Sequence, residues 1–435
     1  MIFAAQSLIL SRTPHLLFAA ALWAIGTQAS IASDDSGLPG EILVKLRTTQ
    51  ALGSLLSRYE LGVLAQFGSR PIYRLNVTGT TSVNNTIAAL LLETDVLLAE
   101  PNTVNSSPEA RRNVVWAIGN ASAYAVQWAP AALRLTAAHG LSTGAGVRVA
   151  ILDTGVDRSH PALAGKLLPG FDFVDYDDDP SEEGSEADLS FGHGTHVAGL
   201  VALVAPDAKI IPVRVLDPSG QSNAWVISEG LLYAVNPDGD PATDDGAHVI
   251  NLSLGSATRT QLFNAIAQIA TCSVDSDPVN DISDPGYDVD EERCSRTGGA
   301  VIVAAAGNDG SSSVKEYPAA ETGTKGLVAV GASAAASKLA AFSNTGSWIR
   351  FTAPGDRITS SVPGGGYGTW SGTSMAAPLA AGSAALLRAM NPTMKPDDII
   401  RRMISRTSAL CGANLRQIDA YAALRDVQPA NTICK

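Results

Sequence analysis

A serine stands in a run of small residues, Ser371-Gly372-Thr373-Ser374-Met375-Ala376-Ala377-Pro378, and an alanine-rich stretch follows it. The pattern predicts a loop that turns sharply into a helix, with Ser374 at the turn. A hydroxyl there lies at the positive end of the helix dipole, and Gly372 and Ala376 leave room for a substrate backbone. Serine is also a common N-cap, so this stretch alone is equally consistent with capping and with a nucleophile.

Three other motifs could supply partners for a serine nucleophile. Asp153-Thr154-Gly155 carries a carboxylate that could hold an imidazole in one tautomer. In Gly192-His193-Gly194-Thr195-His196, the glycines beside His193 indicate the close approach of another chain. The pair of histidines could suggest a metal site, but no His-Glu-x-x-His pattern is present, and we interpret His196 as structural. Asn308, at the end of Ala306-Gly307-Asn308, could donate to a developing oxyanion.

The elements that must position these residues form an alternating series of strands and helices. Buried apolar strands are predicted at residues 147–152, 209–216, 249–254, 301–306 and 327–330, and helices at 193–204, 225–235 and 260–270. This order predicts an α/β fold with a mostly parallel sheet and helices on both faces. Ligands of such folds bind beyond the carboxyl ends of the strands, where Asp153 and Asn308 are expected.

Composition and the first residues indicate an exported protein with an acidic surface. The chain has 435 residues and a net charge of -12, which argues against a nucleic-acid partner. No internal apolar run reaches the roughly 18 residues that span a bilayer. Residues 1–33 combine Arg12 with an uncharged run, Leu16 to Ile25, and then small residues, the pattern of a secretory signal. We therefore expect secretion, either extracellular or periplasmic.

A separate unit is predicted between the signal and the main domain. Strands are expected at residues 40–46, 72–77 and 96–102 and helices at 51–59 and 87–92, which together suggest a small α+β domain. The polar stretch 105–113 is typical of a linker. The main domain is expected to begin near Gln127.

The chain resembles the subtilisin family of serine proteases (subtilases) over roughly residues 127–424. The motifs that carry the resemblance are Asp153-Thr154-Gly155, His193-Gly194-Thr195-His196, Asn251-Leu252-Ser253-Leu254-Gly255, Ala306-Gly307-Asn308 and Gly372-Thr373-Ser374-Met375-Ala376-Ala377-Pro378. The resemblance implies a serine endopeptidase that works through an acyl-enzyme and needs no cofactor for its chemistry. Ser374 would be the nucleophile, His193 the general base and Asp153 the orienting carboxylate. Asn308 and the backbone N–H of Ser374 would form the oxyanion hole.

The resemblance also implies a domain order. Residues 1–33 would be the signal, residues 34–112 a propeptide that assists folding and inhibits the enzyme, and residues 113–435 the peptidase domain. Such a chain would be a monomer made as a self-processed precursor, acting on proteins or peptides without a nucleic-acid or membrane partner.

Substrate contacts follow from the same resemblance. Ser253, Leu254 and Gly255 resemble the edge segment that pairs with an extended peptide, and Gly220-Gln221-Ser222 is expected to form the opposite wall. Glu316, directly before Tyr317-Pro318, would point into the main specificity pocket and attract Arg or Lys on the acyl side. Arg111 and Arg112 could mark a basic site of self-cleavage. The alternative is a Glu316 that points to solvent and ordinary charge in the linker.

Calcium is a second open question. The loop that many subtilisins insert after the catalytic histidine, with its calcium site, is missing here. Acidic loops at 175–188, 238–245 and 275–292 are rich in oxygen ligands. Because none has a recognised calcium spacing, we prefer solvated acidic surface and assign no metal ligands.

The cysteines offer one covalent prediction. Cys272, Cys294, Cys411 and Cys434 allow three disulfide connectivities. We hypothesise the nearest-neighbour pairs Cys272–Cys294 and Cys411–Cys434. No cysteine stands in a motif with histidine, so a thiol protease is not indicated.

Two other functions compete with the protease. An α/β-hydrolase esterase needs its histidine after the serine, and no histidine follows Ser374. A catalytically inactive binding protein with the subtilase fold is the remaining alternative.

Overall fold

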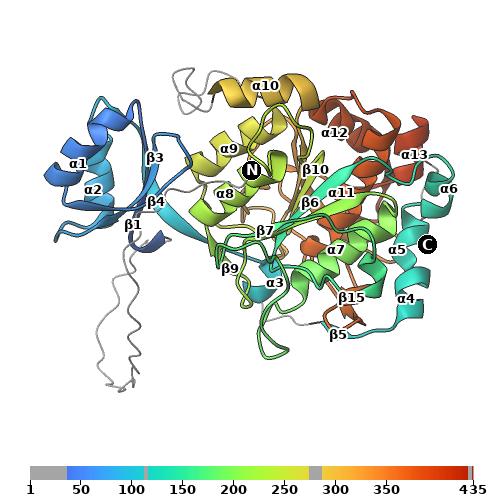
Figure 1. Cartoon of the computed structure of the whole chain (residues 1–435). Helices are drawn as coiled ribbons and strands as arrows, with labels where there is room; N and C mark the ends of the chain where they lie inside the picture. The colour runs from blue at the N-terminus through green and yellow to red at the C-terminus, as the bar shows by residue number, and fades with distance from the viewer. Residues whose placement is uncertain (1–36, 112–115, 274–286, 430–433, 435) are drawn as a thin grey trace, which may run out of the picture.

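The computed structural model describes residues 37–111, 116–273, 287–429 and 434. The predicted signal lies outside these residues, as does most of the acidic insertion at 275–292. Two units are present, a small N-terminal unit and a larger main unit beside it (Figure 1).

A ten-stranded sheet forms the centre of the main unit. Its strands run in the order β17 (Thr407–Ala409), β18 (Arg416–Ile418), β14 (Ile349–Pro354), β12 (Leu327–Ala334), β11 (Val301–Ala305), β10 (Val249–Leu252), β6 (Arg148–Asp153), β8 (Lys209–Arg214) and β7 (Phe171–Asp172), with β13 (Lys338–Leu339) paired to β12. Pairing is parallel except at β17 and β13. The parallel α/β prediction is therefore confirmed.

Helices cover both faces of this sheet because its strands are apolar on both sides. Val149 and Ile151 of β6 pack in one core, with α7 (His193–Val204) and α11 (Thr373–Met390). Ala150 and Leu152 face the opposite way, into a second core with α8 (Ala224–Val235) and α9 (Gln261–Thr271). Alternate side chains of β6 thus pack into two different cores. The carboxyl ends of β6, β10 and β11 lie side by side.

Shorter elements complete the main unit. They are α4 (Ala121–Val126), α5 (Trp128–Ala132), α6 (Leu135–His139), the 3₁₀ turn at Pro161–Leu163, α10 (Tyr287–Thr297), α12 (Pro396–Ser405), α13 (Ala420–Arg425) and a sheet of β15 (Ile358–Val362), β16 (Gly366–Trp370) and β5 (Ala117–Ile118). Disulfides join Cys272 to Cys294 and Cys411 to Cys434, so the nearest-neighbour hypothesis is confirmed. No helix in the described ranges has the length and apolar character needed to cross a membrane.

The N-terminal unit is an antiparallel sheet with two helices on one face. Its elements are β1 (Gly37–Leu46), a 3₁₀ turn (Thr49–Ala51), α1 (Leu52–Arg58), β2 (Leu61–Gln66), β3 (Ile72–Val77), α2 (Val83–Leu90) and β4 (Val96–Ser106). The predicted α+β character is confirmed, although β2 was missed. On the other face, Phe67 packs edge-on against Trp225 of α8, with ring centroids 5.2 Å apart.

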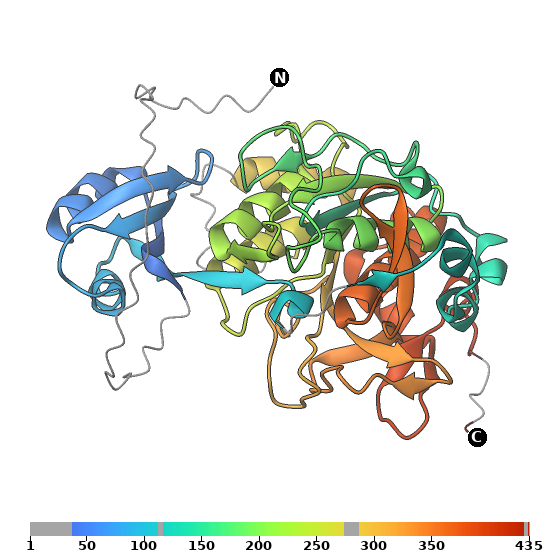
Figure 2. The same ribbon diagram turned by 90° about the horizontal axis from the view of Figure 1, so that it is seen from below.

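Residues 105–113 were predicted as a linker, and the structure corrects this for residues 105–111. The strand β4 continues to Ser106 and pairs with β9 (Gln221–Asn223) of the main unit, and Figure 2 shows β4 running from one unit to the other. A short helix follows, α3 (Pro108–Arg111), in which Ser107 Oγ accepts the N–H of Ala110 at 3.2 Å. The sequence Ser-Pro-Glu starts this turn because proline suits the first helical position.

Candidate active site

An imidazole and a carboxylate meet at the end of β6. Asp153 is the last residue of β6 and His193 the first of α7, and Asp153 Oδ1 lies 2.7 Å from His193 Nδ1. The backbone N–H of Thr154 donates to the same oxygen at 2.8 Å. Gly192 turns the chain into α7 with φ of 86°. The arrangement fixes Nδ1 as the protonated nitrogen and leaves Nε2 for proton transfer.

The Asn308 amide is held by the residue before Ser374. Thr373 donates its backbone N–H and its hydroxyl to Asn308 Oδ1, at 2.8 and 2.9 Å. Asn344 in turn accepts the N–H of Asp309 at 3.1 Å and donates to Ala306 O at 3.0 Å. Asn308 Nδ2 is therefore aimed across the start of α11, where Ser374 lies.

A side chain that the sequence analysis missed fills the space between these groups. Glu109 of α3 is 1% exposed. Its Oε2 lies 3.2 Å from His193 Nε2, and its Oε1 accepts from Asn308 Nδ2 at 2.7 Å. The Ser374 hydroxyl has one hydrogen, which it can donate either to this carboxylate or to Ser253 O at 3.3 Å. The only feature of the sequence that could have indicated Glu109 is the helix start at Pro108.

These contacts set the charges of the site. Burial alone lowers the pKa of His193, but the carboxylates of Asp153 and Glu109 outweigh it and raise that pKa to about 10. Burial raises the pKa of Glu109, yet hydrogen bonds from His193, Ser374 and Asn308 keep it below its usual range. An imidazolium thus lies between two carboxylates. Burial lowers the pKa of His196 to about 3, so this side chain is neutral. A neutral, buried imidazole is consistent with the interpretation of His196 as a structural histidine.

The two expected peptide-binding walls flank an extended segment of the chain. Ser106 exchanges both backbone hydrogen bonds with Gly255, each 2.9 Å long. On the other side Ser106 pairs with Gln221, and the N–H of Ser107 donates to Gly220 O at 2.9 Å. Ser253 and Leu254 are buried behind this wall, and the Ser253 hydroxyl donates to Ser374 O at 2.9 Å.

Glu316 lies inside the protein and not at its surface. Its side chain is 1% exposed, and Arg111 Nη2 lies 2.5 Å from its Oε1. It also lies against Gly255, because a Cβ added there would be 2.3 Å from Glu316 Oε1. Burial raises the pKa of Glu316, and Arg111 opposes that shift. The carboxylate therefore adjoins the expected peptide-binding wall at Gly255 and pairs with the guanidinium of Arg111.

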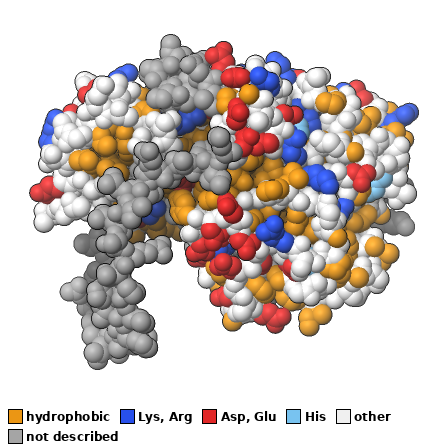
Figure 3. Space-filling model, in the orientation of Figure 1, with side chains coloured by type: hydrophobic (Ala, Val, Ile, Leu, Met, Phe, Trp, Pro, Cys, Tyr) orange, Lys and Arg blue, Asp and Glu red, His pale blue; other side chains and the backbone are white. Residues whose placement is uncertain are grey.

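A buried arginine of β8, Arg214, contacts the acidic loop before His193. Asp172, Asp175 and Glu183 have ligand atoms close enough for a metal, but Arg214 pairs with all three, at 2.5, 2.6 and 3.0 Å. Asp and Glu side chains also gather in the lower middle of the face drawn in Figure 3. Arg214 is 1% exposed, and its single positive charge offsets part of the charge of the three carboxylates. Asp175 and Glu183 remain about half exposed, so the loop is acidic surface anchored at one end by a buried ion pair.

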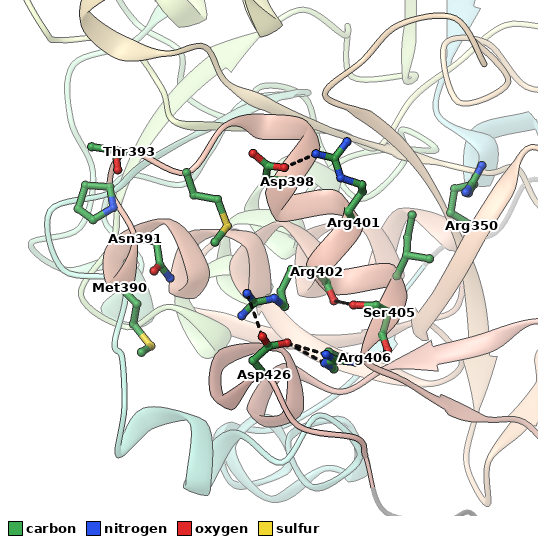
Figure 4. Close-up of a pocket in the computed structure, with 13 residues that line it drawn as sticks. Arg350, Met390, Asn391, Thr393, Asp398, Arg401, Arg402, Ser405, Arg406 and Asp426 are labelled. Atoms are coloured by element: carbon green, nitrogen blue, oxygen red, sulfur yellow. Dashed lines mark hydrogen bonds and ion pairs between the residues drawn. The ribbon is translucent and has the colours of Figure 1, made fainter.

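A separate pocket lies at the far end of α11. Arg350, Met390, Arg402 and Arg406 are among its lining residues (Figure 4). Arg402 and Arg406 both pair with Asp426. Since α11 has 18 residues, its two ends are about 27 Å apart, so this pocket is distant from Ser374.

Comparisons with known proteins identify the family of this chain. A sequence model described as "Subtilase family" matches residues 144–428, and one described as "Fervidolysin N-terminal prodomain" matches residues 27–102. A thermophilic serine proteinase of Bacillus sp. (strain AK1) is 36% identical over 326 residues, 72% of this chain and 68% of the relative. Subtilisin of Bacillus pumilus is 35% identical over 281 residues, 62% of this chain and 86% of that protein.

Solved structures support the fold. Fervidolysin from Fervidobacterium pennivorans, described as a keratinolytic enzyme related to subtilisin, superposes with a TM-score of 0.68 at 23% identity. The match covers 92% of this chain but only 62% of fervidolysin, and at this identity it shows the fold alone. A protease from Pseudoalteromonas arctica superposes with a TM-score of 0.57 at 30% identity, covering 71% of this chain and 99% of that one.

Proposed function

The chain belongs to the subtilase family of serine proteases and carries a prodomain, and we propose that it is a secreted endopeptidase that processes itself. Its catalytic triad is Asp153, His193 and Ser374, with Asn308 as oxyanion donor. The signal comprises residues 1–33, the propeptide residues 34–112 and the peptidase domain residues 113–435.

One observation carries this proposal. His193 Nε2 and Asn308 Nδ2 converge on a single carboxylate beside Ser374, at 3.2 and 2.7 Å. In acyl transfer the base must reach the serine hydroxyl and the oxyanion donor must reach the carbonyl oxygen, so the two groups have to border the same small space beside the nucleophile. In a substrate complex, the peptide carbonyl takes the place that the Glu109 carboxylate holds in the precursor.

The proposed mechanism uses side chains and a backbone N–H of this chain together with one water molecule. His193 Nε2 accepts the Ser374 proton as Oγ attacks the peptide carbonyl, while Asp153 stabilises the resulting imidazolium at Nδ1. Asn308 Nδ2 and the backbone N–H of Ser374 stabilise the tetrahedral oxyanion. His193 then returns the proton to the leaving amine, and water releases the acyl-enzyme by the same steps.

The precursor is latent because its own chain fills the site. Residues Val104 to Ser106 pair with β9, and Ser106 also pairs with Gly255, where a substrate would pair. Glu109 then covers His193 and Asn308. Cleavage after Arg111 or Arg112 therefore requires α3 to unwind, so that a backbone carbonyl replaces the Glu109 carboxylate.

Specificity for Arg or Lys on the acyl side follows from Glu316. The supporting observation is the ion pair with Arg111, in which a buried carboxylate beside the peptide wall accepts a guanidinium from the linker. A substrate arginine would make the same pair once the linker has left.

The test combines mass, labelling and turnover. The intact mass and N-terminal sequence of the protein recovered from the culture medium or periplasm report secretion and processing. Fluorophosphonate should label Ser374 in the mature protein, and Ser374→Ala should abolish casein hydrolysis and leave the precursor uncut. An unlabelled Ser374 in correctly processed protein would favour the inactive binding protein.

A further inference from the structure

The loop that carries residues 180–183 packs directly against the turn after Asp153. The N–H of Val156 donates to Pro180 O at 3.0 Å. Gly155 adopts a φ of 107°, and a Cβ on it would lie 2.5 Å from Ser181 O. No other residue type fits this contact without moving the loop, so the loop and the turn are fitted to each other.

From this loop, the Glu182 carboxylate reaches the backs of two triad motifs. Thr154, next to Asp153, donates its hydroxyl to Glu182 Oε1 at 2.6 Å. Thr195, two residues after His193, donates its hydroxyl and its backbone N–H to Glu182 Oε2, at 2.8 and 3.2 Å. One carboxylate therefore joins the turn that holds Asp153 to the first turn of the His193 helix.

The direction of these hydrogen bonds is fixed by their neighbours. Thr154 Oγ1 accepts the N–H of Gly194 at 2.9 Å, and Thr195 Oγ1 accepts the N–H of Asp157 at 2.8 Å. Each hydroxyl hydrogen is therefore directed at Glu182. An ionised carboxylate accepts all three hydrogen bonds. A glutamine amide has only one accepting oxygen, and its NH2 group would face the hydrogen-bond donors of one of the two threonines.

The next residue anchors the loop from the other side. Glu183 pairs with Arg214 at 3.0 Å, and Arg214 stands opposite Asp153 in the register of β6 and β8. Glu182 and Glu183 thus fix the same loop to the helix start and to the sheet.

We propose that Glu182 is a positioning residue of the active site, which sets the distance and orientation between Asp153 and His193 through Thr154 and Thr195. It touches neither substrate nor reacting atoms. The inference rests on the proposed triad, and it adds to Asp153 a second acidic residue whose removal impairs the chemical step and not peptide binding.

The experiment uses the mature enzyme from the full-length precursor, with Glu182→Gln, Glu182→Ala and the control Glu186→Gln. Glu186 is an exposed glutamate of the same loop. Burial raises the pKa of Glu182 to about 7, against the hydrogen bonds of the threonines and with a smaller contribution from Asp153. Assays at about pH 8.5 therefore keep the carboxylate ionised. Thr154→Ser and Thr154→Val test the connecting hydroxyl.

We expect kcat of Glu182→Gln to fall on the order of 100-fold, the loss that a small misplacement of catalytic groups causes, while its KM and Tm stay unchanged. The control Glu186→Gln should keep the kcat of wild type. Thr154→Ser should retain activity. Thr154→Val should lose it, and the double variant with Glu182→Gln should fall no further than one single variant.

A kcat of Glu182→Gln within about threefold of wild type overturns the inference, as does a loss that multiplies in the double variant. A fall in kcat that is matched by a fall in Tm also overturns it, because the role is then only structural. Failure of the proposed triad is distinguishable, because wild-type mature protein would then show no labelling of Ser374.

Discussion

Glu109 Oε1 lies 2.7 Å from Asn308 Nδ2, and the other oxygen of the same carboxylate lies 3.2 Å from His193 Nε2. In the proposed mechanism, this charged side chain of the precursor thus takes the hydrogen bonds that a reacting substrate needs. The contact is anionic like a tetrahedral intermediate, but it offers no carbonyl for attack. It explains how an assembled site can coexist with an intact linker.

Removing this charge should make the precursor reactive. In Glu109→Gln and Glu109→Ala precursors, fluorophosphonate labelling of Ser374 and self-processing should both rise by about tenfold or more, since hydrogen bonds to charged groups contribute about 1.5–3 kcal/mol. The control is Glu60→Gln, an exposed glutamate of the prodomain. Equal rates for Glu109→Ala and wild-type precursor would show that the carboxylate does not block the site.

The blocked state should weaken at alkaline pH. The carboxylates of Asp153 and Glu109 overcome burial and raise the pKa of His193 from 6.5 to about 10. A raised histidine pKa contributes stability that is complete below 6.5 and is lost as pH rises through about 10. Precursor labelling should therefore accelerate across this range, more than in the Glu109→Gln precursor. A titration of His193 by NMR checks the cause, and an unshifted pKa in wild-type precursor would contradict it.

Loss of the Asn308 amide should affect the chemical step alone. In the mature enzyme, Asn308→Ala should lower kcat by about 10²–10³-fold with little change in KM, which is the magnitude known for the side-chain oxyanion donor of a subtilisin. Thr373 orients the amide through Asn308 Oδ1, so Asn308→Asp, which keeps that acceptor but lacks the N–H, should be equally impaired. A changed KM with an unchanged kcat would place Asn308 in ground-state binding instead.

The sheet could be predicted because its information is local. Runs such as Val149 to Leu152 are apolar on both faces, which is typical of a parallel strand covered on both sides. The same periodicity predicted Asp153 and Asn308 just beyond the carboxyl ends of β6 and β11, the two strands that flank β10. The strand β2 was missed because Val63 and Leu64 are half exposed, so the segment lacks a clear alternation of buried and exposed residues.

The occupants of the site could not be predicted, because their partners are distant in sequence. Glu109 meets residues 84 and 199 positions away, and its local context is typical of a polar linker. Glu182 stands in an acidic run whose composition suggests solvated surface. Only the fold shows that this residue turns inward to two threonines.

Arg214 should stabilise the acidic loop without a metal. Its guanidinium is buried against Asp172, Asp175 and Glu183. Arg214→Met leaves Asp172 buried without a partner cation, so it should lower the free energy of unfolding by about 3–5 kcal/mol. Thermal or urea unfolding of the mature enzyme measures this, with the exposed Arg357→Met as control. Equal stability of the two variants would show that the cluster does not need its cation.

Glu316 should set the preference of the primary specificity pocket. Its carboxylate is buried beside Gly255, and it already binds a guanidinium in Arg111 of the precursor. Peptides that differ only at the acyl-side residue should therefore show a higher kcat/KM for Arg than for Leu or Phe. Glu316→Gln should reduce the ratio of Arg to Leu by roughly 10-fold to 100-fold, because a charge-assisted hydrogen bond contributes about 1.5–3 kcal/mol. It should leave kcat/KM for the Leu peptide within about threefold of wild type, which serves as the internal control for folding.

The same variant should weaken the ion pair with Arg111 in the precursor. Fluorophosphonate labelling of the precursor should therefore rise, while the mature variant loses its preference for the Arg peptide. The Arg advantage could instead be absent in wild type, or it could survive in Glu316→Gln. Either result would show that the Arg111–Glu316 pair only stabilises the folded precursor and that other residues determine the specificity of the pocket.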